Sequence, residues 1–245
     1  MTFQLPSAND KAEYVLRQFD RIAANYDLTN DLISLCLHRL WKRRAIEALA
    51  LKPGGIYLDV CCGTGDLALA IALRLSNSGR VVGIDFSQNM LDLAKRRSEA
   101  IAASRADLAK IDWLKGDAEH LPFADRSFDG AIISFGLRNL TSLKQGLSEM
   151  ARVVKSNGTV VNLDLGHPKA PIFTPIYHLY FEKFVPLIGD LVAGDRSAYT
   201  YLPSSLKAYP KPEGITELFA DAGLTDITHQ PLALGSVALH KGTVP

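Results

Sequence analysis

Short apolar segments that favour strands alternate with longer amphipathic segments that favour helices, and this order constrains the fold more than any other feature. At this spacing, strand–helix–strand units are right-handed and build a parallel sheet covered by helices. A short loop joins the last two strand segments, so these two pair antiparallel. We therefore predict an α/β fold with a mostly parallel seven-stranded sheet and one antiparallel strand. The strand segments are 56–60, 80–84, 111–115, 128–133, 158–165, 225–230 and 235–241.

Composition limits the classes of protein that remain. The chain has 245 residues, of which 47% are hydrophobic and 22% charged, and this suits one globular domain over 1–245. The net charge of +1 argues against nucleic acid as a partner. No apolar run approaches the roughly 20 residues that span a bilayer, and the N-terminus carries no secretion signal. Three cysteines make no disulfide framework, so we expect a cytoplasmic protein.

Two segments lie outside the alternating pattern. Residues 1–50 have helical spacing and predict a helical N-terminal cap. Residues 166–210 form an insertion before the last helix and hold eight of the twenty aromatic residues. A connection this long and apolar is usually functional. It is interpreted either as a helical subdomain that buries its aromatic side chains in its own core or as a cover over an apolar substrate, and the two interpretations are compatible.

The turn at residues 59–66, with the sequence DVCCGTGD, predicts a ligand site after the first strand. Gly63 and Gly65 permit positive φ and a close approach of ligand to backbone, and the following helix presents free N–H groups. Gly63, Gly65 and Ala68 also fit the dinucleotide pattern, with Asp85 about twenty residues further on. The spacing alone therefore leaves NAD and other adenosine cofactors open.

Two features favour S-adenosylmethionine (SAM) over NAD. Asp59 and Asp66 flank the turn, where carboxylates would repel a pyrophosphate but attract an ammonium and a sulfonium. Asp117 and Ala118 follow the third strand, where a carboxylate can accept a hydrogen bond from an adenine amino group and a backbone N–H can serve a ring nitrogen. These acids could also be helix caps or loop solubilisers. That alternative leaves unexplained why four of them stand at consecutive strand ends.

Four segments resemble the ubiquinone/menaquinone biosynthesis C-methyltransferases, the UbiE/MenG type within the class I SAM-dependent methyltransferases. The resemblance covers about residues 10–242, and the glycine turn is its least specific part. Cys61-Cys62 looks most like the phylloquinone branch, which methylates a phytyl-naphthoquinol, whereas Thr29, Cys36 and His167 depart from the usual residues. The four segments are Tyr26-Asp-x-x-Asn-Asp-x-x-Ser34 with His38-Arg-x-Trp-Lys42, Gly63–Asp66, Ser134–Asn139, and Tyr199-x-Tyr-Leu-Pro-x-Ser205 with Tyr209-Pro210.

The resemblance implies a Rossmann-like class I methyltransferase fold and SAM as the methyl donor. It implies a set of SAM-binding residues, to which the turn itself adds Asp59, Gly63 and Gly65. No His/Cys cluster has the spacing of metal ligands, so we expect no metal. The implied SAM-binding residues are Thr64, Asp85, Asp117, Ala118 and Ser134.

For the chemistry, the resemblance implies that Arg138 acts with an ordered water as the base, while Asn139 and Tyr26 orient that water. A guanidinium stays protonated, so we favour a role for Arg138 in stabilising a phenolate; a surface ion pair is the alternative. His167 follows the fifth strand, and an imidazole can serve as a base, but the resemblance places no base there. His38 is expected to pack against Trp41, and His120 to be structural.

The family reaction moves a methyl group to a ring carbon of a prenylated quinol. We predict a demethylnaphthoquinol substrate (demethylphylloquinol or demethylmenaquinol), with a benzoquinol of ubiquinone biosynthesis as the alternative. An NAD-dependent oxidoreductase and a non-catalytic prenylquinone-binding module are the other candidate classes. Because such a quinol is dissolved in a membrane, we expect transient peripheral contact through the insertion and a basic stretch, unless that stretch is a solvated helix face. The sequence does not determine the number of subunits, and a homodimer is one of the assemblies it allows. The basic residues are Arg39, Lys42, Arg43 and Arg44.

Overall fold

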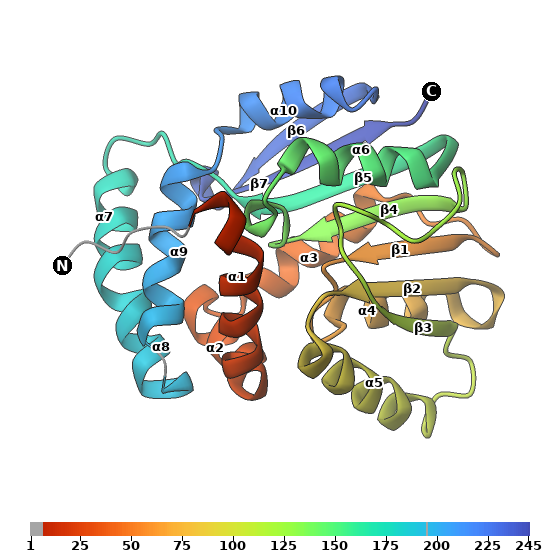
Figure 1. Ribbon diagram of the computed structural model, residues 1–245, viewed down its shortest axis with the longest axis horizontal. Coiled ribbons are helices and arrows are strands. Elements are labelled where there is room, and N and C mark those ends of the chain that lie inside the picture. Colours follow the sequence, from red (N-terminus) through yellow and green to blue (C-terminus); the bar gives the residue numbers. More distant parts are fainter. Residues whose placement is uncertain (1–6, 195) are drawn as a thin grey trace.

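The computed structural model describes residues 7–194 and 196–245, and a seven-stranded sheet lies at its centre (Figure 1). The strand order is β3-β2-β1-β4-β5-β7-β6. β7 pairs antiparallel with β5 and β6, and every other pair is parallel, which confirms the predicted sheet. The strands are β1 (Ile56–Val60), β2 (Arg80–Asp85), β3 (Lys110–Lys115), β4 (Phe128–Ser134), β5 (Val154–Leu165), β6 (Thr225–Leu232) and β7 (Val237–Thr243).

Helices cover both faces of the sheet, and local signals in the sequence set where several of them begin. The Ser87 hydroxyl accepts a hydrogen bond from the Met90 N–H and caps α5. Ser142 caps α6 in the same way, through the Gln145 N–H. The helices are α1 (Ala8–Ile22), α2 (Tyr26–Ser34), α3 (Leu37–Ala48), α4 (Asp66–Leu75), α5 (Gln88–Ala102), α6 (Leu143–Val153), α7 (Phe173–Leu179), α8 (Val185–Ala193), α9 (Arg196–Ala208) and α10 (Pro212–Asp221).

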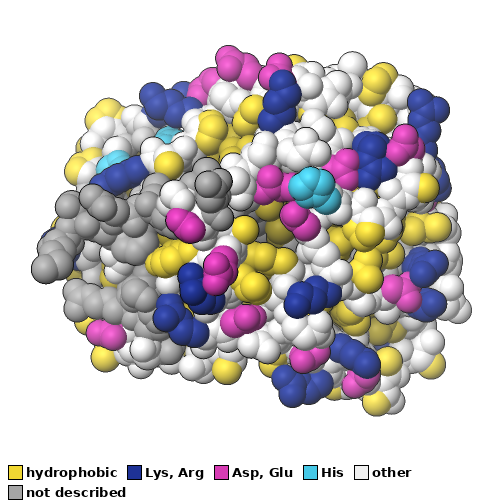
Figure 2. All heavy atoms as spheres, viewed as in Figure 1, with side chains coloured by type: hydrophobic (Ala, Val, Ile, Leu, Met, Phe, Trp, Pro, Cys, Tyr) yellow, Lys and Arg dark blue, Asp and Glu magenta, His cyan; other side chains and the backbone are white. Residues whose placement is uncertain are grey.

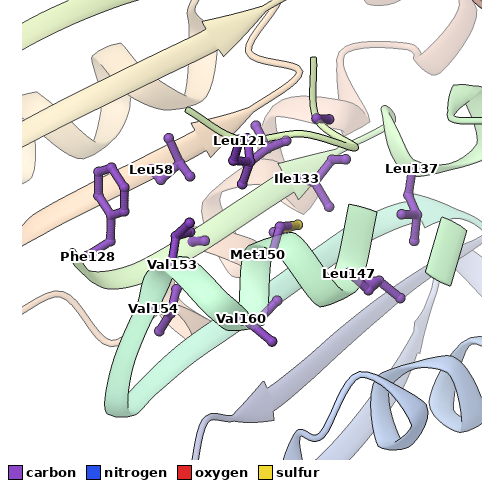
Figure 3. Close-up of a cluster of buried hydrophobic side chains, with 14 of the residues drawn as sticks. Leu58, Leu121, Phe128, Ile133, Leu137, Leu147, Met150, Val153, Val154 and Val160 are labelled. Atoms are coloured by element: carbon purple, nitrogen blue, oxygen red, sulfur yellow. The ribbon is translucent and has the colours of Figure 1, made fainter. Parts of the chain in front are cut away.

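Two hydrophobic clusters hold these helices against the sheet. In the first, Leu147 and Met150 of α6 pack on Leu58 and Ile133 of the central strands (Figure 3), and α10 adds Phe219. In the second, side chains of α3 and α4 pack on the other face of the same strands. Because β1 and β4 are buried on both faces, their sequences are nearly continuous apolar runs rather than alternating ones.

A helical layer lies beyond the carboxyl ends of the parallel strands (Figure 1) and combines the N-terminal helices with the insertion. Its core contains Ile22 of α1 together with Tyr177, Phe181 and Tyr199 of the insertion. The insertion therefore buries aromatic side chains in a core of its own, as one of the two interpretations expected, but it shares that core with α1. Among the described residues, no helix is long and apolar enough to span a membrane. On the face seen in Figure 2, charges of both signs are interspersed.

Candidate active site

The site lies at the carboxyl ends of β1, β2 and β4, where the strand order reverses. In open α/β sheets, ligands bind in the crevice at such a switch point. The turn after β1 occupies it, and its two glycines serve different purposes. A Cβ atom on Gly65 (φ 84°) would lie 2.6 Å from the Trp113 ring, whereas a Cβ atom on Gly63 (φ 54°) would meet nothing within 4 Å. Gly65 is needed for packing, and the space beside Gly63 is open to a ligand.

Asp85, the last residue of β2, is buried and fixes the shape of the turn. One carboxylate oxygen accepts a hydrogen bond from the Gly63 N–H (2.9 Å) and the other accepts one from the Ser87 N–H (2.9 Å). Burial raises the pKa of Asp85 to about 6, although these N–H groups partly lower it. A carboxylate oxygen can accept more than one hydrogen bond. Asp85 can therefore bind ligand hydroxyls while it holds the turn.

The two acids that flank the turn differ in charge. Asp59 is buried and accepts a hydrogen bond from the Ala68 N–H (2.9 Å), and burial raises its pKa to about 7. Burial also acts to raise the pKa of Asp66, but Lys42 (3.0 Å) and Arg97 (2.6 Å) outweigh it and hold that pKa at about 2. The expectation that Asp66 offers free negative charge to a cationic ligand is therefore wrong, because two cations already neutralise it.

A smaller cavity of about 80 Å³ lies beside the turn, and it brings together the acids of two strand ends. Asp85, Asp117 and Ala118 line it, together with Met90. The exposed Asp117 carboxylate is hydrogen-bonded to the His120 ring (3.1 Å) and to the Glu119 N–H (2.8 Å), and these contacts orient it. Asp85 and the two residues predicted to bind adenine thus line one cavity, and His120 supports Asp117.

A larger cavity of about 500 Å³ adjoins the smaller one, because Gly63, Ser134 and Tyr26 line both. Its walls come from α1, α2, α3, the turn, the end of β4 and the insertion, and most of them are apolar. Tyr177 and Phe173 of the insertion contribute aromatic rings to this wall. The insertion therefore has both of the features considered for it, a core of its own and a surface that faces a cavity.

Buried polar atoms without a hydrogen-bond partner in the described chain gather on residues that line the larger cavity. Leaving such an atom unpaired costs about 1–3 kcal/mol, so native proteins rarely keep several in one place. These atoms are therefore available to pair with a bound ligand or with water. The atoms are Gln18 Oε1, Ser134 Oγ, Arg138 Nε, Asn139 Oδ1 and the Tyr177 hydroxyl.

Arg138 forms a buried ion pair that the sequence did not reveal. Its Nη1 donates to Asp164 Oδ1 (2.6 Å) and to the Phe135 carbonyl (2.6 Å), and the two charged side chains are only 6% and 1% exposed. Burial lowers the pKa of Arg138, but Asp164 together with Tyr26 and Tyr201 outweighs it, and the net shift is upward. Arg138 therefore does form an ion pair, but the alternative of an ion pair at the surface is wrong, because the pair is buried. Asp164 lies at the end of β5, the strand that pairs with β4, which ends at Ser134. Its position at a strand end was the feature of the sequence that could have identified it as a site residue.

Tyr26 and Thr64 connect the N-terminal helices to the site. Tyr26 begins α2 and lines both cavities; burial raises the pKa of its phenol, and Asn30 and Arg138 partly lower it. The Thr64 hydroxyl donates to Asp27 Oδ1 (2.7 Å), so its proton is committed to α2. Asp27 in turn accepts from Arg97 (2.8 Å). This network holds α2 against the glycine turn.

Two histidines and one lysine differ from what the sequence suggested. His167 lines neither cavity, and its ring contacts the Tyr209 carbonyl (3.0 Å), which removes it from the candidate bases. His38 lines the larger cavity, and its ring has a hydrogen bond to Asp31 (2.8 Å) that was not expected. Lys42, expected on a basic outer surface, points inward to Asp66.

The sheet order, the glycine turn at the switch point and the acids at successive strand ends define a class I SAM-dependent methyltransferase. Solved structures share this fold. One is a SAM-dependent methyltransferase of Thermotoga maritima, described as a possible histamine N-methyltransferase, with a TM-score of 0.63 at 19% identity, covering 94% of this chain and 100% of that one. Another is phosphoethanolamine N-methyltransferase 2 of Haemonchus contortus bound to SAM, with a TM-score of 0.61 at 15% identity. The match covers 83% of this chain and 52% of that one.

The family is narrower than the fold. The model of the ubiE/COQ5 methyltransferase family matches residues 7–244. A demethylmenaquinone methyltransferase of Desulfitobacterium hafniense is 44% identical over 239 residues, covering 98% of this chain and 93% of that protein. A mitochondrial 2-methoxy-6-polyprenyl-1,4-benzoquinol methylase of Oryza sativa is 38% identical. The match covers 95% of this chain and 84% of that protein. The chain belongs to the ubiE/COQ5 methyltransferase family and uses SAM as its methyl donor, as the resemblance implied.

The raised pKa of Asp59 predicts how the stability of the ligand-free protein depends on pH. The folded-state value of about 7 lies above the value of about 3.9 for an unfolded chain. The stabilising contribution is therefore complete below pH 4 and is lost as the pH rises through 7. Between pH 5 and 8, the free energy of unfolding of the wild type should fall by about 2–4 kcal/mol relative to Asp59→Asn.

Urea unfolding at several pH values checks this expectation. The difference between the wild-type and variant curves cancels the contributions of the other titrating groups. Asp92→Asn is the matched control, because Asp92 is exposed on α5 and should follow the wild-type curve. Parallel wild-type and Asp59→Asn curves would show that Asp59 is already ionised in the folded state at pH 5.

Proposed function

We propose that this protein transfers the methyl group of SAM to a ring carbon of a prenylated demethylnaphthoquinol in quinone biosynthesis. The observation that carries the proposal is the 500 Å³ apolar cavity adjoining the acid-lined crevice, with several unpaired polar atoms on its wall. That combination suits a ligand with polar ring oxygens and an apolar tail. The 44% identity to the demethylmenaquinone methyltransferase of Desulfitobacterium hafniense supports the naphthoquinol, while a second demethylmenaquinone methyltransferase, of Bacillus cereus, is 38% identical, as the benzoquinol methylase is.

In this proposal, the two cavities divide the SAM molecule between them. Asp117 and the Ala118 N–H bind adenine, and Asp85 binds the ribose hydroxyls. The buried Asp59 faces the cationic end, because it has no ion-pair partner among the described residues. The open space beside Gly63 admits the ligand next to the backbone. The remaining contacts come from Thr64, Gly65 and Ser134.

SAM supplies a methyl group that is electrophilic because it is carried on a sulfonium. The protein must make the ring carbon nucleophilic, and ionising the adjacent hydroxyl does so. Asp164 neutralises the charge of Arg138 but leaves its Nε–H without a partner in the described chain, and this oriented donor stabilises the resulting phenolate oxygen by a hydrogen bond. Asn139 and Tyr26, which line the same cavity, orient a water that carries away the ring proton. The cavity aligns the ring carbon with the methyl group.

The apolar tail of the substrate leads out of the cavity at its mouth. Leu35, Ile176 and Leu234 line the larger cavity and are also 77%, 59% and 67% exposed, so they form an apolar rim. The basic stretch contributes less than the sequence suggested, because Arg39, Lys42 and Arg43 pair with Asp31, Asp66 and Glu47. We therefore assign membrane contact to this apolar rim rather than to basic side chains.

Methyl transfer itself tests the proposed function. Incubation with labelled SAM should place one methyl group on a ring carbon of a short-tailed demethylnaphthoquinol, and side-by-side assays should give a higher kcat/KM for it than for the benzoquinol. Mass spectrometry of the product locates the methyl group. Label found only in a benzoquinol would reassign the substrate. Binding of quinol without any transfer would indicate a non-catalytic module, and tight NADH binding without SAM binding would indicate an oxidoreductase.

Asp85→Asn should weaken SAM binding by about tenfold to a hundredfold, which corresponds to about 1.5–3 kcal/mol for hydrogen bonds to a charged group. The amide keeps the size of the side chain but loses the charge and one acceptor. Isothermal titration with SAM measures the effect, and Asp92→Asn on the exposed face of α5 is the control. An unchanged Kd in Asp85→Asn would remove Asp85 from the ribose site.

The apolar rim predicts membrane binding that does not need anionic lipid. The double variant Leu35→Gln/Leu234→Gln should reduce sedimentation with phosphatidylcholine vesicles at least tenfold, because each buried leucine contributes about 1.5–3 kcal/mol. Leu114→Gln, on the edge strand β3 (Figure 1), changes an exposed leucine that lines neither cavity, and it should bind as the wild type does. Equal vesicle binding by all three proteins would exclude the rim as the docking surface.

A further inference from the structure

His38 has the geometry of an oriented base in the wall of the larger cavity. It lies in the first turn of α3, is 5% exposed, and lines the cavity that also contains Arg138 and Tyr26. Its Nε2 is 2.8 Å from Asp31 Oδ1 on α2. The Asp31 carboxylate is held in turn by two hydrogen bonds from Arg39, at 2.9 Å and 2.5 Å. The ring is therefore fixed by a partner that is itself fixed.

This partner determines which ring nitrogen carries the proton. The hydrogen bonds from Arg39 and His38 lower the pKa of Asp31, so its carboxylate is ionised and can only accept. Nε2 must then carry the hydrogen, and Nδ1 has the free lone pair. Nδ1 has no hydrogen bond within the described chain. An imidazole oriented by a carboxylate, with its second nitrogen free, is the arrangement of a general base.

The charges around His38 favour the neutral ring. Burial lowers the pKa of His38, and Lys42 on the same helix lowers it further, while Asp31 on α2 and Asp66 at the start of α4 partly raise it. Lys42 and Asp66 neutralise one another through their ion pair. The imidazole is thus uncharged near pH 7 and available to take a proton.

The other ionisable groups of the cavity are poorly suited to this task. Arg138 stays protonated, and Asp164 is paired with it. Burial raises the pKa of the phenol groups of Tyr26 and Tyr177, so both stay protonated near pH 7. Asp59 faces the cationic end of SAM in the proposed function. Asp66 is paired with Lys42 and Arg97, and burial raises the pKa of the Cys61 and Cys62 thiols. Among the described residues that line this cavity, His38 is therefore the best suited to accept the quinol hydroxyl proton.

We propose that His38, positioned by Asp31, is the general base that removes the hydroxyl proton of the quinol; this rests on the proposed function. The O–H bond breaks, the proton goes to Nδ1, and the electron pair enters the ring from oxygen. The ring carbon then forms a bond to the methyl group as the methyl–sulfur bond breaks, and the sulfur leaves as a neutral thioether. The hydrogen on that carbon departs as a proton to water, which restores the aromatic ring.

His38→Gln is the principal test, because its side-chain amide can still donate to Asp31 while offering no base. With a short-tailed demethylnaphthoquinol and SAM both saturating, kcat should fall about 10²- to 10⁴-fold. The Kd for SAM should stay within twofold. The wild-type kcat should decrease at acidic pH as His38 becomes protonated, and the variant should lose this acidic limb. Arg43→Gln is the matched control: it is exposed on the same helix, does not line the cavity, and should retain the wild-type kcat.

Two further measurements separate a base from a residue that only holds α2 against α3. In His38→Ala, added imidazole should restore part of kcat, because it can occupy the vacated space and accept the proton. Asp31→Asn should lower kcat in the wild-type background but not in His38→Gln, since a positioning residue has nothing left to position. Thermal unfolding of each variant shows whether the fold is retained.

Several results would overturn the proposal. One is a His38→Gln enzyme that keeps its kcat and its acidic limb. Another is a large rise in the Kd for SAM with unchanged kcat, which would make His38 a donor-binding residue. Failure of imidazole to rescue folded His38→Ala would also count against it. Failure of the proposed function looks different, because the wild type itself would then transfer no methyl group to any quinol.

Discussion

The site depends on two carboxylates that the sheet buries at its carboxyl edge without ion-pair partners among the described residues. Asp59 and Asp85 accept only backbone N–H donors there, and burial raises both pKa values, to about 7 and about 6. Charge held in this way is costly unless a cation approaches. The same hydrogen bonds shape the glycine turn and the start of α4, so the two buried acids also fix the backbone beside the crevice.

A second layer of charge joins the N-terminal helices to that turn. Thr64, Asp27, Arg97, Asp66 and Lys42 form a continuous chain of hydrogen bonds and ion pairs from α2 and α3 to the start of α4. The helices that wall the larger cavity are therefore fixed relative to the cofactor crevice. In an enzyme that must align a ring carbon with a methyl group, this fixed relation limits the geometry of the reaction.

Many residues of the candidate site were predicted from local sequence. The residues that were misjudged or overlooked have partners that lie far from them in the sequence. Asp85 and Asp117 were predicted because strand ends of a parallel sheet meet at one edge, and Ser134 was predicted from the family resemblance; the structure places all three in the lining of the smaller cavity. Asp66 was misjudged because Lys42, 24 residues away, neutralises it. Asp164 was overlooked although its strand end is next to that of Ser134. His38 was given a packing role because nothing local shows that it turns to Asp31 and faces a cavity.

The sequence by itself determined the sheet, its antiparallel strand and the glycine turn, because apolar periodicity, caps and turn residues act over a few positions. It also identified the family, because the order and spacing of the matching segments can be read from the sequence alone. Only the tertiary structure decided the charge state of each acid, the buried Arg138–Asp164 pair and the cavity walled by both α1 and the insertion. Burial and ion pairing are properties of side chains that meet from distant parts of the chain, so no local pattern encodes them.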